Sequence, residues 1–299
     1  MNYGIIAPSS HNVQAGYDTV NSVHYFTIPG SFSYHATGNN SSFRLGSNVN
    51  VPGRWAFRID HGPPLNEDTG PFYPIAGNTS SRSLHGSSPQ ILLQQPFVYF
   101  GQSYNHIYVN HNGHLTFSAP WYNYIPQRFP MYGSRDVIAP FWTDFDNRVN
   151  GQVYYNQYTS GSVLQQATQD INEYFPGFNF SATWVFVATW YEMAYYPMTG
   201  TRTTIQAVLI SGGQYSFVLM NYGIIAPSSH HVQAGYDTVN SVHYFTIPGS
   251  FSYNATGNNS SFRLGSNVNV PGRWGFLINH GPPLNEDTGK SENKSVLVF

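Results

Sequence analysis

The 299-residue chain contains no cysteine. Disulfide-stapled scaffolds, cysteine-ligated zinc sites and thiol nucleophiles all need that side chain, so the sequence excludes these three classes. Disulfides also cannot indicate the cellular compartment. The fold must therefore rest on a hydrophobic core, which a domain of about 200 residues can build without covalent cross-links.

Charged residues are scarce as well. They make up 9% of the chain, against about a quarter in ordinary soluble domains, and the formal net charge is −2. Basic-patch binding of nucleic acid and disordered acidic segments both need far more charge. No apolar run approaches the length of about 18 residues that a transmembrane helix needs, and residues 1–30 lack a signal-peptide pattern. We therefore expect no nucleic-acid partner, and neither a membrane span nor a signal peptide in this chain.

A long internal repeat is present instead. Residues 1–70 and 220–289 are identical at 65 of 70 positions. Surface and loop residues are copied together with apolar ones, which indicates a recent tandem duplication. The offset of 219 residues is a whole domain, far longer than a solenoid or propeller unit. The pairs that differ are Asn12/His231, His35/Asn254, Ala56/Gly275, Arg58/Leu277 and Asp60/Asn279.

Met220 follows "TTIQAVLISGGQYSFVL", two apolar runs around a Ser-Gly-Gly turn, which predicts a β-hairpin with Met220 in its second strand. Met1 then corresponds to an internal methionine. We interpret residues 1–62 as a partial duplicate, the C-terminal third of a domain, and the chain as a fragment. The alternative is a genuine start with residues 1–62 as an added arm.

Aromatic residues reach 17% of the chain and gather with β-branched residues in short runs. "HIYVNHNGHLTF" predicts a hairpin, because Asn-Gly supplies the positive φ of a tight turn. One helix is predicted, with apolar residues at helical spacing from Leu164 to Ile171, a capping box at Ser162 and Gln165, and an end at Pro176. Many short strands separated by turns favour a mainly β fold, an antiparallel β-sandwich or barrel-like domain with one or two short helices.

Proline, glycine and serine concentrate in residues 63–96, which we interpret as a linker. A complete domain is expected over residues 97–282, and residues 283–299 form a tail.

Six motifs then occur in a recognisable order: "YVNHNGHLTF", "APFWTDFDNRVNGQVYY", "WVFVATWYEM", "TTIQAVLISGGQYSFVLMNYG", "VQAGYDT" and "NVNVPGRWGF". In order and spacing they resemble the nidogen-like (NIDO) extracellular domain, which occurs in nidogen, alpha-tectorin and mucin-like proteins. The resemblance covers residues 97–280 completely, while residues 1–61 repeat its C-terminal third. It implies an extracellular module of matrix or cell-surface proteins, associated with cell–matrix adhesion and without a catalytic activity. No EGF-like, sushi or von Willebrand module accompanies it here.

Asp144 and Asp146 are the best candidates for a metal site. Alternate residues of a strand point to one face, so both carboxylates and Asn147 or Asn150 can converge on a hard cation such as calcium. The alternative is that these carboxylates cap turns at a strand end. A glycosidase pair would have to combine Glu192 with one of the two aspartates, and we do not expect an enzyme.

Trp184, Phe186, Ala188 and Trp190 share one strand face and are expected in the core. The adjacent Tyr195 and Tyr196 are the candidate binding residues at the surface, since tyrosine joins an apolar ring to a polar tip. Candidate N-glycosylation sites in Asn-x-Ser/Thr sequons are Asn39, Asn40, Asn78, Asn179, Asn254, Asn258, Asn259 and Asn293.

The sequence therefore predicts a non-catalytic, secreted or ectodomain module that contacts extracellular matrix proteins or glycans. The alternative is a carbohydrate-binding β-sandwich with calcium as a candidate ligand; no other cofactor is expected.

Overall fold

The computed structural model describes residues 16–18, 25–27 and 71–279. The chain divides into two units, Met1–Thr69 and Gly70–Phe299. The predictions for residues 1–15, 19–24, 28–70 and 280–299, which include those for Asn39, Asn40 and Asn293, lie outside the described residues.

In the first unit, β1 (Gly16–Asp18) and β2 (Tyr25–Thr27) pair antiparallel, with Gly16 opposite Thr27. The repeat places the equivalent pairing in the second unit, where Gly235 lies opposite Thr246. The two copies thus share the register of this strand pair.

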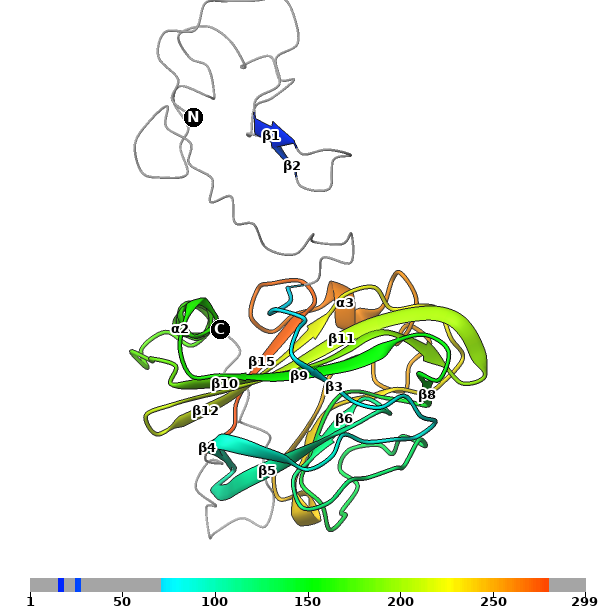
Figure 1. Ribbon diagram of the computed structural model, residues 1–299, viewed down its shortest axis with the longest axis horizontal. Helices are drawn as coiled ribbons and strands as arrows, with labels where there is room; N and C mark the ends of the chain where they lie inside the picture. Colours follow the sequence, from blue (N-terminus) through cyan, green and yellow to red (C-terminus); the bar gives the residue numbers. More distant parts are fainter. Residues whose placement is uncertain (1–15, 19–24, 28–70, 280–299) are drawn as a thin grey trace, which may run out of the picture. The chain divides into compact units, whose positions relative to one another are not determined.

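The second unit consists of two antiparallel sheets, one above the other in Figure 1. The seven-stranded sheet has the order β15-β12-β11-β10-β9-β3, with β8 paired to β10. Its strands are β3 (Asn78–Thr79), β8 (Phe145–Asp146), β9 (Gln152–Tyr158), β10 (Trp184–Tyr195), β11 (Met198–Gly212), β12 (Tyr215–Tyr222) and β15 (Arg273–Leu277). The predicted mainly β, antiparallel sandwich is confirmed.

The six-stranded sheet has the order β14-β13-β7-β6-β5-β4. Its strands are β4 (Ile91–Tyr99), β5 (Gln102–Asn110), β6 (His114–Thr116), β7 (Val137–Trp142), β13 (Gln233–Asp237) and β14 (Tyr244–Thr246). The helical elements of the described part are α2 (Ser162–Tyr174), η2 (Val239–Ser241) and α3 (Ser261–Leu264), and none of them is long and apolar enough to cross a membrane.

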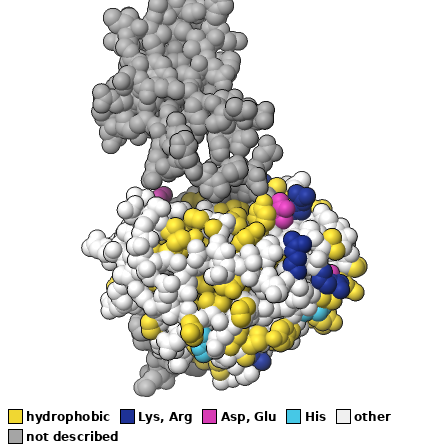
Figure 2. Space-filling view, in the orientation of Figure 1, with side chains coloured by type: hydrophobic (Ala, Val, Ile, Leu, Met, Phe, Trp, Pro, Cys, Tyr) yellow, Lys and Arg dark blue, Asp and Glu magenta, His cyan; other side chains and the backbone are white. Residues whose placement is uncertain are grey.

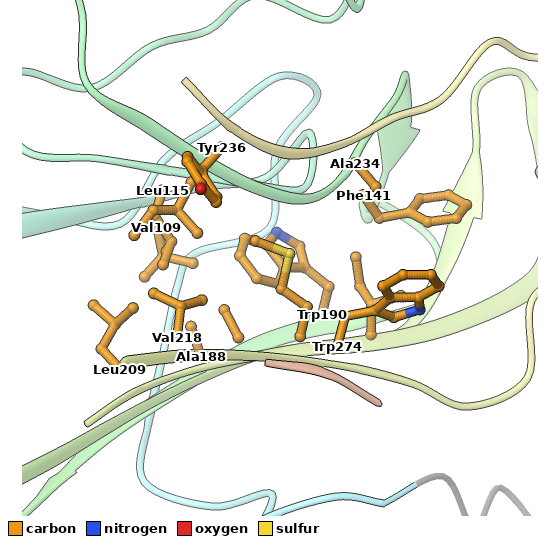
Figure 3. Packing of buried hydrophobic residues seen from close by; sticks show 14 of the residues in the cluster. Val109, Leu115, Phe141, Ala188, Trp190, Leu209, Val218, Ala234, Tyr236 and Trp274 are labelled. Atoms are coloured by element: carbon orange, nitrogen blue, oxygen red, sulfur yellow. The ribbon is translucent and has the colours of Figure 1, made fainter. Parts of the chain in front are cut away.

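The main core lies between the sheets. In Figure 3, Val109, Leu115, Phe141 and Tyr236 of the six-stranded sheet face Ala188, Trp190, Leu209 and Val218 of the seven-stranded sheet. On β10 the predicted core residues Trp184, Phe186, Ala188 and Trp190 are all buried in this cluster. The residues between them face the other way because side chains alternate along a strand.

Both sheets are also covered on their outer faces. Helix α2 packs Val163, Ala167 and Ile171 against Val185 and Val187 of β10. This two-sided burial explains why β10 is apolar almost throughout instead of alternating with polar residues. A smaller cluster lies on the outer face of the six-stranded sheet and contains Phe129, Val137, Ala139 and Trp142.

Local signals predicted the hairpins and the helix well. Asn110 lies opposite His114 across the Asn-Gly turn, and Ala207 lies opposite Met220 in the β11–β12 hairpin. Helix α2 ends at Tyr174, just before Pro176. The capping box was wrong, because Gly161 occupies the N-cap and no side chain caps the helix.

The linker over residues 63–96 needs correction, because residues 71–96 belong to the folded unit. Tyr73 is buried, and its backbone exchanges hydrogen bonds with the Gln206 side chain. β3 pairs with β9, and β4 pairs with β5. Pro96 lies inside β4 at a break in the register, where a proline is tolerated. The proline and glycine content thus marks turns and a bulge within the fold.

A buried arginine connects the start of the segment 71–96 to helix α2 and the seven-stranded sheet. Arg273 of β15 donates to Asp170 of α2 at 2.7 Å, to Asn221 of β12 at 2.9 Å, and to the backbone carbonyl of Pro71. Tyr73 also donates to Asp170 at 2.9 Å. Removing one partner of such a pair leaves a buried charge uncompensated, so the network holds helix, sheet and segment in one arrangement.

Positions that differ between the two copies of the repeat suggest substitutions that test the packing of the residues just after β15. Asn279, which is Asp60 in the other copy, is buried and donates its Nδ2 to the Gln214 carbonyl at 3.0 Å. An aspartate there loses the donor and faces a carbonyl with a buried charge. We expect Asn279→Asp to lower the free energy of unfolding by about 2–4 kcal/mol, measured by urea unfolding at neutral pH.

His231→Asn is the matched control, because it also copies the other repeat but at an exposed position. It should change stability by no more than about 0.5 kcal/mol. Equal effects of the two substitutions would contradict the packing described for Asn279.

Candidate binding surface

The connection between β6 and β7, residues 117–136, forms neither helix nor strand. Irregular loops longer than about 12–15 residues are uncommon in compact domains and are usually functional when ordered. We call these residues the β6–β7 loop. Because it has no hydrogen-bonded ladder of its own, its backbone groups need other partners.

Buried polar side chains of the six-stranded sheet supply those partners. Asn110 Oδ1 accepts from the backbone N–H of Trp121 at 2.7 Å, and His114 Nε2 donates to the Trp121 carbonyl at 3.1 Å. Burial lowers the pKa of His114 to about 4, so the ring is neutral at physiological pH.

The far part of the β6–β7 loop is held in the same way. Gln233 Oε1 accepts from Phe129 N at 3.3 Å, and Asp237 Oδ2 accepts from Met131 N at 2.8 Å. Both side chains are fully buried in β13. Side chains from two distant parts of the sequence thus fix the loop against the sheet.

Some side chains of the β6–β7 loop pack against the six-stranded sheet, and most of its large solvent-facing side chains are aromatic. Trp121 and Met131 pack on the outer-face cluster that contains Phe129 and Trp142. The large apolar side chains that point to solvent are Tyr122, Tyr124, Ile125 and Tyr132. A loop fixed by its backbone therefore presents a preorganised row of tyrosines, the residue type most favoured at binding surfaces.

His85 joins this row to the seven-stranded sheet. Its ring stacks on Tyr124, with centroids 4.3 Å apart and planes at 17°, and lies 6.5 Å from the ring of Tyr196. Tyr124 and Tyr196 are 42% and 39% exposed. The two tyrosines thus flank one histidine while each keeps a large free surface.

Asp144 lies between β7 and β8 and contacts both His85 and Tyr196. Its backbone carbonyl accepts from Tyr196 N at 3.0 Å, and its Oδ1 lies 3.5 Å from His85 Nδ1. The carboxylate makes no hydrogen bond, and its Oδ1 is buried. Burial raises the pKa of Asp144, an effect that nearby His85 and His230 partly offset.

The other residues proposed for calcium have partners within the protein. Asp146 accepts from the guanidinium and the backbone N–H of Arg148, and these bonds hold the pKa of Asp146 below its ordinary value. Asn147 Oδ1 accepts from Ser83 N at 2.9 Å, and Asn150 Nδ2 donates to the carbonyls of Glu192 and Thr201. Within residues 71–279, no group of three or more His, Asp or Glu side chains is placed to hold a metal ion. Calcium binding stays a prediction.

Tyr195 is not a surface residue. Its ring is fully buried, and its hydroxyl donates to the Ala226 carbonyl at 3.2 Å. The register of β10 against β11 shifts twice between Trp190 and Tyr195, which changes the simple alternation and turns Tyr195 into the core. Tyr196 remains as the exposed member of the predicted pair.

Tyr122, Tyr124 and His85 were not identified from the sequence. For the two tyrosines, the available signal was the segment "SAPWYNYIPQRFPMYGSRD", where aromatic residues are mixed with prolines and no helix or strand period appears. Aromatic residues on such a loop favour binding over core packing.

The described sequons differ in exposure. Asn78, Asn179, Asn258 and Asn259 are exposed, whereas Asn254 is half-buried and its Oδ1 accepts from Ser252 Oγ. An N-glycan on Asn254 would be attached to Nδ2 and not to the Oδ1 that accepts this bond, and glycans on the other four side chains would extend into solvent.

Charge on the surface is sparse, as the composition requires. Figure 2 shows the basic side chains of one face gathered along one side, while hydrophobic side chains are scattered in small patches over the rest. Arg148 and Arg202 each pair with an acid, Asp146 at 2.8 Å and Glu192 at 3.4 Å. Glu192 thus has an ion-pair partner, whereas the carboxylate of Asp144 accepts no hydrogen bond.

The sequence profile of the nidogen-like domain (NIDO) matches residues 7–61 and 105–280. Alpha-tectorin of Mus musculus is 37% identical over 216 residues, which cover 64% of this chain and 10% of that protein. Alpha-tectorin of Gallus gallus is 35% identical over 70% of the chain and 10% of its own length. Nidogen of Drosophila melanogaster is 30% identical over 70% of the chain and 16% of its own length.

The chain thus spans about a tenth of the alpha-tectorins and a sixth of the fly nidogen. No solved structure matches it significantly. Two separate stretches of one chain match the same profile, and they include most of the described sandwich. The chain belongs to the nidogen-like (NIDO) domain family, and its relatives are proteins of the extracellular matrix.

Proposed function

We propose that the chain supplies a non-catalytic extracellular module that takes part in cell–matrix adhesion through protein or glycan contacts. The observation that carries this proposal is the β6–β7 loop, whose backbone is fixed by buried side chains while Tyr122, Tyr124 and Ile125 face solvent. A rigid aromatic surface binds a partner with little loss of conformational entropy. The matrix relatives support an extracellular location, either secreted or as part of an ectodomain.

The domain organisation is part of the proposal. Residues 1–62 are a partial duplicate of the module, and the complete module begins near residue 71 instead of residue 97 and ends near residue 282, before a tail. The register shared by the β1–β2 and β13–β14 pairs and the two profile matches support this division.

A second candidate function is carbohydrate binding, with calcium as a possible ligand. The observation in its favour is the carboxylate of Asp144, which makes no hydrogen bond and lies beneath the half-exposed rings of Tyr124 and Tyr196.

Adhesion through the tyrosine row can be tested with a double substitution. Tyr122→Ala with Tyr124→Ala removes two exposed rings and no backbone contact, so the fold should persist. We expect the number of cells attached to surfaces coated with the purified chain to fall at least about fivefold, because exposed aromatic anchors dominate interface energies.

Tyr253→Ala is the control, since Tyr253 is 99% exposed and lies outside the β6–β7 loop. It should attach as many cells as the unaltered chain, with unchanged melting temperatures for all variants. Attachment no better than to uncoated surfaces, or an equal loss with Tyr253→Ala, would reject the proposed role of the loop.

The proposed extracellular location also predicts glycosylation. When the chain is secreted from animal cells behind an added signal sequence, we expect N-glycans at Asn78 and Asn179, whose side chains are exposed. Mass spectrometry before and after enzymatic deglycosylation measures occupancy. Ser181→Ala keeps Asn179 but destroys its sequon, and it should remove that glycan alone. An unmodified Asn179 in the unaltered protein would contradict the prediction.

A further inference from the structure

Burying the side chain of Asp144 costs desolvation free energy, and its contacts within the fold do not offset that cost. Its side chain is 13% exposed, and its carboxylate accepts no hydrogen bond. His85 Nδ1 lies 3.5 Å from Oδ1, and the ring of His85 stacks on Tyr124. Buried polar groups without partners are rare, and each one requires an explanation. Asp146, two residues away, shows the ordinary solution, because the guanidinium and backbone N–H of Arg148 donate to its carboxylate.

The surroundings of Asp144 define what could satisfy it. The centroids of the Tyr124 and Tyr196 rings lie 4.3 and 6.5 Å from that of His85, and both side chains are about two-fifths exposed. A ligand at this position therefore meets aromatic faces and a carboxylate that can accept up to four hydrogen bonds. It must bring hydrogen-bond donors together with an apolar face.

Charge narrows the choice of ligand. Asp144 disfavours an anionic group at the same point. A metal ion would need several ligands, and within residues 71–279 no group of three or more His, Asp or Glu side chains is placed to hold one. A neutral ligand with several hydroxyl donors avoids both conflicts. A pyranose ring has these properties, because its hydroxyls lie at the edge and its C–H groups form a face that stacks on aromatic rings.

We propose that a neutral sugar ring of an extracellular glycan binds over Asp144, donating hydroxyl hydrogen bonds to its carboxylate and stacking on Tyr124 or Tyr196. The inference rests on the proposed adhesive function and names the ligand class for one part of the same surface. Oδ1 is buried and His85 Nδ1 lies 3.5 Å from it, so His85 must shift when the hydroxyls reach Oδ1.

The test uses the full chain on immobilised oligosaccharides of glucose, galactose, mannose and N-acetylglucosamine, with heparan sulfate and hyaluronan as anionic probes. We expect binding to at least one neutral probe, in calcium and in chelator alike. Asp144→Asn keeps the shape but loses the charge-assisted bonds, so affinity should fall at least about tenfold. Tyr196→Ala should give a similar loss.

Glu173→Gln is the matched carboxylate control, because Glu173 is exposed on α2. It should leave affinity unchanged. Loss of binding with Asp144→Asn but not with Glu173→Gln separates the site from a general effect of charge.

Thermal unfolding supplies a readout that a merely structural aspartate would not give. Burial raises the pKa of Asp144, so its ionised form destabilises the folded state above that raised pKa. Asp144→Asn should therefore melt at the same or a higher temperature at pH 7, and its advantage should shrink as the pH falls and Asp144 takes up a proton. A marked loss of stability at pH 7 would mean that Asp144 supports the fold, and would overturn the inference.

The other outcomes are equally decisive. No neutral probe bound, or unchanged affinity in Asp144→Asn, rejects the sugar site, and cell attachment that still depends on Tyr122 and Tyr124 would leave the proposed adhesion standing with a protein partner. Salt-sensitive binding of heparan sulfate or hyaluronan alone would assign the ligand to the arginines and reject the site. Binding lost in chelator would place a cation between sugar and protein and reject direct contact with Asp144.

Discussion

The backbone of the β6–β7 loop must find hydrogen-bond partners without a strand ladder, and this requirement organises the surface that we assign to binding. Four buried polar residues lie in strands that otherwise carry core side chains, and each uses one polar atom to bond a loop N–H or carbonyl: Asn110, His114, Gln233 and Asp237. Burying them is favourable only because those bonds form. Hydrogen bonds from the six-stranded sheet to the loop backbone therefore position the exposed tyrosines of the loop.

The sheets themselves could be predicted because their signals are local. Asn112-Gly113 and Gly212-Gly213 set two hairpins, and the alternation of Trp184, Val185 and Phe186 follows the period of a strand. Residues 71–96 were placed in a linker because proline and glycine mark turns inside a fold as well as between folds, and only the contacts of Tyr73 and β4 distinguish the two cases.

The candidate site could be predicted only in part, since its contacts are not local. Gln233 and Asp237 bind loop residues more than 100 positions away. Tyr195 and Tyr196 are adjacent in sequence, yet register shifts in β10 bury one and expose the other. Asp144 and Asp146 look equivalent as alternate strand residues, but Arg148 satisfies only the second. Pattern alone cannot rank such pairs, because the difference lies in partners supplied by other elements.

The repeat copies residues that support the β6–β7 loop but none of the exposed residues of the candidate surface. The copied stretch 220–289 includes Gln233 and Asp237, which fasten the loop, and β13, β14 and β15, which complete the sheets. His85, Tyr122, Tyr124, Asp144 and Tyr196 all lie between residues 71 and 219, and residues 1–70 contain no counterpart of any of them. The repeat therefore duplicates scaffold and not the exposed surface. Because the residues that carry the proposed surface occur once, within residues 71–219, attachment through several such surfaces would need further copies of the whole module.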